Sequence, residues 1–149
     1  MLSKLLRVTA VAALLTLAPA QAAAAPSLHH LSGGGTASIS QVAMNVAIGG
    51  SGSASGSFEC LMAGRSGFVL GDFGLAHNMI VHATPTSGSV AGSTVTFAGL
   101  GSLILDGHQK MNIHVQVSAN IATQSFQLTV VEVGTLPVET LLTGRLGLS

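Results

Sequence analysis

After its first 25 residues, this sequence is dominated by short runs in which apolar and polar residues alternate one by one. The clearest run covers residues 110–119, where Met111, Ile113, Val115 and Val117 alternate with Asn112, His114, Gln116 and Ser118. Because successive side chains of a strand point to opposite faces, this run predicts a β-strand with one buried face. We found no segment of 11 or more residues with sustained helical periodicity, so the sequence predicts an all-β fold.

Further strand-like runs are separated by stretches rich in glycine and serine. The runs cover residues 42–48, 57–63, 75–84, 94–98, 102–105, 126–130 and 138–148. Asp106-Gly107 lies between two of them and is a strong hairpin signal, because both central residues of that turn tolerate positive φ. We therefore expect one antiparallel domain over residues 26–149, with about seven to nine strands arranged as a β-sandwich or a closed β-barrel. The sandwich is slightly favoured.

Residues 1–25 have the pattern of a secretory signal peptide. Lys4 and Arg7 precede an apolar centre of about 11 residues, and alanines follow Pro19 as a small-residue cleavage zone. A helix that crosses a bilayer needs about 20 apolar residues, so we expect cleavage near residues 22–25 and no transmembrane anchor afterwards. The mature chain is then secreted or periplasmic.

The composition makes several classes of partner poor candidates. Five Lys or Arg residues balance five Asp or Glu residues, so the chain lacks the basic surface that nucleic acids require. It contains neither Trp nor Tyr, which disfavours carbohydrate binding by ring stacking. No sequence pattern indicates a cofactor.

The six histidines are the first candidates for chemistry, because imidazole is the commonest metal ligand and general base. His29 and His30 fall in the segment just after the cleavage zone, which we expect to be mobile. The other four, His77, His82, His108 and His114, are weak candidates for metal ligands. His77 and His82 lie five residues apart and would point to opposite sides of one strand, and neither H-x-H nor H-E-x-x-H spacing occurs.

Cys60 is the only cysteine, so it is unpaired within the chain. It alternates with Phe58 and Met62, which predicts a buried and unreactive thiol with a raised pKa. The alternatives are a Cys60-linked dimer and, less favoured, a catalytic thiolate. A neighbouring Glu59 carboxylate would raise the thiol pKa further.

Hydrolase patterns are weak in this chain. It contains no G-x-S-x-G nucleophile motif, and no spacing places two acids opposite each other, so catalytic residues are not predicted. Of the five acids, Glu59, Asp72 and Asp106 are expected at the surface or in turns, whereas Glu132 and Glu139 lie among apolar neighbours. Strict alternation would send both outward. If either were buried in a pocket without a basic partner, it would mark the best candidate site.

Five segments of the mature chain stand out as a set: GGGTA at 33–37, FECLMAG at 58–64, VTFAGLGSL at 95–103, FQLTVVEVG from Phe126 and TLPVETLLTGRL, which ends at Leu146. Together they resemble a family of small uncharacterised secreted bacterial β-domain proteins. The resemblance covers most of the mature chain and implies one exported β-domain. It brings no substrate, cofactor or catalytic residue, and it gives the FECLMAG segment no role.

The sequence therefore favours a non-enzymatic exported β-domain that acts as a binding or structural module. One alternative is a small metal-binding protein or enzyme that uses His77, His82, His108 or His114. Another is a carrier that holds an apolar ligand in a barrel cavity.

Overall fold

The computed structural model describes residues 28–64 and 77–149, which form ten strands and no helix. No helix in these residues is long and apolar enough to span a membrane. The predicted signal peptide, Asp72 and the start of the predicted run 75–84 lie outside the described residues. The strands are β1 (Leu28–Thr36), β2 (Gln41–Gly49), β3 (Ala54–Met62), β4 (Met79–Ala91), β5 (Thr94–Leu105), β6 (His108–Asn120), β7 (Ser125–Val130), β8 (Gly134–Thr135), β9 (Glu139–Thr140) and β10 (Arg145–Leu148).

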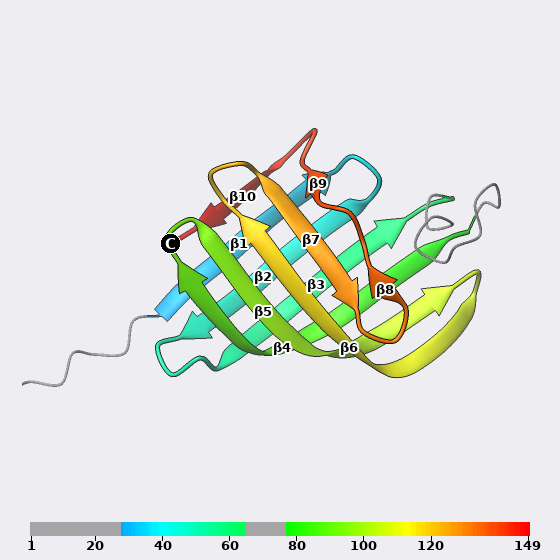
Figure 1. Cartoon of the computed structure of the whole chain (residues 1–149), viewed down its shortest axis with the longest axis horizontal. Helices are drawn as coiled ribbons and strands as arrows, with labels where there is room; N and C mark the ends of the chain where they lie inside the picture. Colours follow the sequence, from blue (N-terminus) through cyan, green and yellow to red (C-terminus); the bar gives the residue numbers. More distant parts are fainter. Residues whose placement is uncertain (1–27, 65–76) are drawn as a thin grey trace, which may run out of the picture.

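All ten strands belong to one antiparallel sheet. Strands β1 to β8 follow one another as hydrogen-bonded neighbours, β10 pairs with the free side of β1, and β9 pairs with β7. The sheet curls into a half-barrel in which β5–β7 cross over β1–β3 (Figure 1). The all-β antiparallel prediction is confirmed. The structure differs in detail, because ten strands replace the expected seven to nine and one curled sheet replaces the two-sheet or fully closed arrangement.

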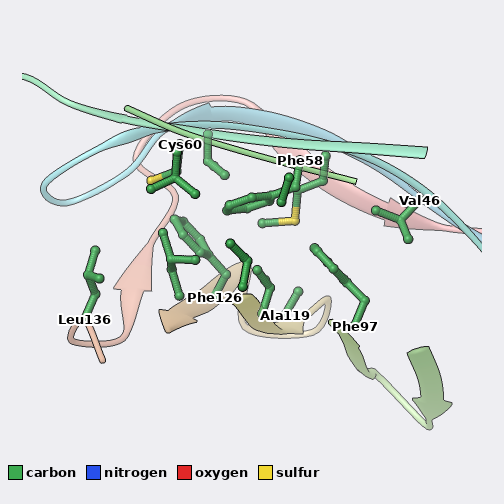
Figure 2. Close-up of a cluster of buried hydrophobic side chains, with 14 of the residues drawn as sticks. Val46, Phe58, Cys60, Phe97, Ala119, Phe126 and Leu136 are labelled. Atoms are coloured by element: carbon green, nitrogen blue, oxygen red, sulfur yellow. The ribbon is translucent and has the colours of Figure 1, made fainter. Parts of the chain in front are cut away.

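The core lies between the facing parts of this curled sheet. Phe58 from β3 and Phe97 from β5 meet edge to face, with ring centroids 5.7 Å apart, and Phe126 from β7 packs into the same cluster (Figure 2). The alternating runs in β2, β3 and β7 bury the faces that the sequence predicted. Burying apolar side chains from both layers is the main stabilising contribution expected in a domain without a disulfide.

Strand β1 was not predicted from the sequence, because it is rich in glycine. The segment that includes Gly33, Gly34 and Gly35, together with both N-terminal histidines, forms β1 and pairs along its length with β2. A Cβ atom at Gly33 would lie 1.9 Å from the carbonyl oxygen of Arg145 in β10. These glycines therefore allow β10 to approach β1 closely instead of marking a mobile segment.

The strands of the C-terminal half also have other bounds than the sequence predicted. The predicted runs 94–98 and 102–105 are parts of one strand, β5, whereas the predicted run 138–148 is divided into the short strands β9 and β10. The Asp106-Gly107 turn is confirmed, with φ angles of 48° and 82°.

A bulge in β6 changes which way the first part of that strand faces. Ile113 pairs with Gly101 and Met111 pairs with Ser102, so Asn112 is left as the extra residue. Asn112 has a φ of 59°, in the left-handed region that asparagine tolerates better than most residues. The bulge turns Met111 outward, where it is 60% exposed. The sequence had placed Met111 in the core with Ile113, and that prediction is wrong.

Candidate functional site

The outer face of the sheet carries an open hollow of about 570 Å³ over β2–β6. Apolar side chains contribute to its surface, because Leu100 is 48% exposed and Met111 is 60% exposed. Neighbouring strands add the polar residues Glu59, His82 and Asn112 to the lining. Apolar surface combined with a few convergent polar groups is typical of ligand sites. We refer to this feature as the outer hollow.

Two irregularities in β5 and β6 shape the outer hollow. The Asn112 bulge brings the Met111 side chain to the same face as Glu59 and His82. In β5, a Cβ atom at Gly101 would lie 1.9 Å from the carbonyl oxygen of His82, so glycine permits β5 to approach β4 closely at this point. Bulges commonly re-aim side chains in this way.

Glu59 and His82 lie side by side in the outer hollow. They are register partners on β3 and β4, and His82 Nδ1 lies 3.2 Å from Glu59 Oε2. Both side chains are accessible, at 55% for Glu59 and 47% for His82. Such a pair can present a carboxylate oxygen and an imidazole to a ligand, although it adds little to stability by itself.

The row of polar residues continues to Ser102, which is the register partner of His82 on β5. A nucleophilic serine should be within hydrogen-bond reach of its base. Within the described residues, however, no hydrogen bond joins Ser102 to His82. The structure therefore places Ser102 next to His82 without a nucleophile–base hydrogen bond between them.

The remaining histidine candidates lie near two different acids, with His77 and His108 near Asp106 and His114 beside Glu132. His77 Nδ1 donates to Asp106 Oδ2 at 2.5 Å, and His114 Nδ1 donates to Glu132 Oε1 at 2.7 Å. His108 is exposed at the start of β6. Over residues 28–64 and 77–149, no three His, Cys, Asp or Glu side chains come together as a possible metal site. Each of these metal-ligand candidates thus lies near one acid of the described part of the chain, and the described residues do not bring three such groups together.

These histidine contacts alter the two carboxylates concerned. The hydrogen bond from His77, together with one from the backbone N–H of Asn78, lowers the pKa of Asp106 below its ordinary value. The hydrogen bonds that the His114 side chain and backbone N–H donate lower the pKa of Glu132 in the same way. Both carboxylates therefore stay ionised to a lower pH than ordinary Asp and Glu residues.

Cys60 and Glu139 belong to a buried polar cluster at the opposite side of the sheet from the outer hollow. Cys60 is fully buried and Glu139 is 1% exposed. Glu139 Oε2 accepts a hydrogen bond from Ser40 Oγ at 2.8 Å and another from the backbone N–H of Ile39 at 3.1 Å. The carboxylate thus fastens the β1–β2 turn to β9, and alternation was wrong to send it outward. Glu132 is exposed, as alternation predicted.

The buried cluster has the character of a structural contact. Burial raises the pKa of the Cys60 thiol to about 12, the contact with Ser40 opposes that rise, and the Glu139 charge adds to it. The predicted raised pKa is confirmed, but its acidic neighbour is Glu139 and not Glu59, which faces the other side of β3. Glu139 Oε1 is buried without a hydrogen-bond partner among the described residues, yet Glu139 does not line the outer hollow.

A second surface hollow, of about 480 Å³, lies over β4–β7. Its lining includes Ser89, Thr96, Gln116, Ser118 and Gln127, and it contains no charged residue. Ser89 Oγ and Thr96 Oγ1 satisfy each other at 2.8 Å. With its hydroxyl and amide groups and without an exposed large apolar side chain, it is a less specific candidate than the outer hollow.

No family model, curated protein or solved structure matches this chain. The resemblance to small secreted bacterial β-domain proteins therefore stays a prediction.

From the sequence, His82 and Glu59 were predicted as single candidates, without their neighbours in the outer hollow. Met111 was predicted in the core, and Leu100, Ser102 and Asn112 had no predicted role. The available signals were an asparagine inside an otherwise regular strand and the two glycines at 99 and 101. Both residue types are common at bulges and close strand approaches.

Proposed function

We propose that this chain is an exported, non-enzymatic binding module that holds its ligand in the outer hollow. The observation that supports this most directly is the joint presence there of two exposed apolar side chains, Leu100 and Met111, and the accessible Glu59–His82 pair. Exposed apolar side chains that gather beside a few polar groups favour ligand binding over plain solvation.

Binding is favoured over the two alternatives for separate reasons. An enzyme or metal protein based on histidine would need a base in contact with a nucleophile, or several converging ligands. Among the described residues, three histidines, His77, His82 and His114, each pair with a single acid instead, and no three possible ligands converge there. A carrier would need space inside the curled sheet, and there the facing strands fill the interior with packed side chains (Figure 2).

Methionine methyl NMR tests the binding role directly. Met111 faces the outer hollow, whereas Met62 and Met79 are fully buried and serve as internal controls. With methyl-labelled protein, titration with 1-hexanol should shift the Met111 signal while those of Met62 and Met79 stay in place. If Met111 does not respond to hexanol or to its charged analogues, the outer hollow is not a binding site.

Export is the second part of the proposal, and it depends on residues 1–25. When the full chain is expressed in a bacterium, we expect a protein shortened by 22 to 25 residues to be recovered outside the cytoplasm. Intact mass spectrometry of the cell fractions measures this. Recovery of the uncut chain in the cytoplasm alone would contradict export.

A further inference from the structure

We propose that the outer hollow selects organic cations, specifically a primary ammonium group carried on an apolar chain. This inference rests on the proposed binding function and adds the chemical class of the ligand. In this arrangement the ammonium group contacts Glu59, and the apolar chain lies against Leu100 and Met111.

Glu59 has an oxygen left for such a ligand. His82 Nδ1 lies near Oε2, and no other side-chain hydrogen bond or ion pair of Glu59 is found within the described residues. Its side chain is 55% exposed, so the carboxylate is accessible to a ligand. An ammonium group donates three hydrogen bonds and suits an acceptor-only carboxylate.

The charges around the outer hollow favour a cation. Its lining contains no Lys or Arg. On the other side of Leu100 lies its register partner on β6, His114. The His114 side chain is hydrogen-bonded to Glu132, which is the second carboxylate near the apolar side chains. Lys110, one residue from Met111, pairs with Leu103 and belongs to the opposite face of β6. The apolar patch therefore lies between two carboxylates, each with a histidine beside it, and anionic ligands are disfavoured wherever these histidines are neutral.

Leu100 and Met111 provide the surface that the apolar part of the ligand would contact. Both are about half exposed or more, and covering them removes apolar surface from water. Methionine is flexible and adapts to ligands of different shape. Because the Glu59 contact is solvent-accessible, the gain from charge is modest, and we expect an amine to bind about threefold to fivefold more tightly than the matching alcohol.

Three probes of equal chain length separate the contributions. Hexylamine, 1-hexanol and hexanoate are titrated at pH 7.5 and low salt, with the Met111 methyl signal as the readout. We expect the order of affinity to be amine, then alcohol, then carboxylate, and we expect added salt to weaken only the preference for the amine.

Two matched variants locate the charge that is responsible. Glu59→Gln should make hexylamine and hexanol bind equally while hexanol affinity is unchanged. Glu132→Gln removes the same charge outside the hollow and should leave most of the amine preference intact. Unshifted Met62 and Met79 signals verify folding of both variants.

The outcomes distinguish the two proposals. If hexanol and hexylamine bind the native protein equally well, the cation preference is wrong while the binding function stands. If Glu132→Gln abolishes the preference as fully as Glu59→Gln, the general field of the protein is responsible, and the proposed Glu59 contact is overturned. If none of the three probes shifts Met111, the binding function itself fails.

Discussion

Glu139 is the residue that most clearly joins distant parts of the chain. Its carboxylate is buried and accepts hydrogen bonds from Ser40 Oγ and the backbone N–H of Ile39, about a hundred positions earlier in sequence. A buried donor that loses its acceptor costs more free energy than an exposed one. The contact therefore matters for stability although Glu139 does not line the outer hollow.

Glu139→Ala should lower the free energy of unfolding by about 2 to 3 kcal/mol, because it leaves two donors in the β1–β2 turn without their acceptor. Ser40→Ala removes only one of the hydrogen bonds and should cost about 1 kcal/mol. Urea denaturation at neutral pH measures both changes. Equal stability of Glu139→Ala and the native protein would show that the carboxylate does not fasten the turn.

Cys60 provides a second prediction for a single residue. Its thiol is fully buried, and its pKa is raised to about 12. Since the thiolate is the reactive species, we expect a thiol reagent at pH 8 to label the folded protein at least about a hundredfold more slowly than the denatured protein. The folded chain should also remain free of disulfide-linked dimers on non-reducing gels. Rapid labelling of the folded protein would contradict the buried position.

Asp106 and Glu132 give the protein an acid dependence whose direction follows from their contacts. Both have folded pKa values below their ordinary values of 3.8 and 4.5, because histidines donate hydrogen bonds to them. A lowered folded pKa contributes stability that is fully present above the unfolded pKa and is lost as the pH falls through the folded pKa.

The urea midpoint should therefore decline between about pH 5 and pH 3. The double variant Asp106→Asn with Glu132→Gln should show a shallower decline, and asparagine still accepts the positive φ of the turn at position 106. A decline as steep in the double variant as in the native protein would assign the acid sensitivity to other groups.

Among the elements, the edge strand β10 is stabilised in an uncommon way. Its inner side pairs with β1. On its other side, the Gln124 side chain accepts a hydrogen bond from Leu146 N–H at 2.8 Å and donates one to the Leu146 carbonyl at 3.1 Å. One amide group thus replaces a neighbouring strand at this position. Covering a free edge in this way limits pairing with other chains.

Gln124→Ala should expose this edge and lower the free energy of unfolding by about 1 to 2 kcal/mol. The amide hydrogen of Leu146 should exchange with solvent much faster than in the native protein. Gln116→Ala, a matched change on the outer face of β6, should leave both quantities nearly unchanged. Unchanged exchange at Leu146 in Gln124→Ala would contradict the proposed contact.

For the individual strands, the alternation of apolar and polar residues predicted the buried face well where the strand pairs regularly. Val42, Met44, Val46 and Ile48 are buried as expected. Alternation failed where the backbone departs from regular pairing. Asn112 adds one residue to β6, and every position before it then changes face, which is why Met111 was misplaced. A single sequence carries no direct signal for such a register change.

At the scale of the whole molecule, the sequence predicted the class of fold but not how the strands close. Long-range pairs such as Gly33 with Leu146 join the two ends of the described chain, and local patterns do not specify partners so distant. The outer hollow could not be predicted for the same reason. Its lining comes from five strands, and only Glu59 and His82 were visible beforehand as groups with possible chemistry.

One curled sheet encloses a packed core, and the β6 bulge turns Met111 out into the outer hollow. Methyl NMR of the methionines in the presence of a soluble paramagnetic agent tests this arrangement. The structure predicts strong broadening of the Met111 methyl signal, with little effect on the buried Met44, Met62 and Met79. A Met111 signal as protected as the other three would place this side chain in the core and contradict both the bulge and the site.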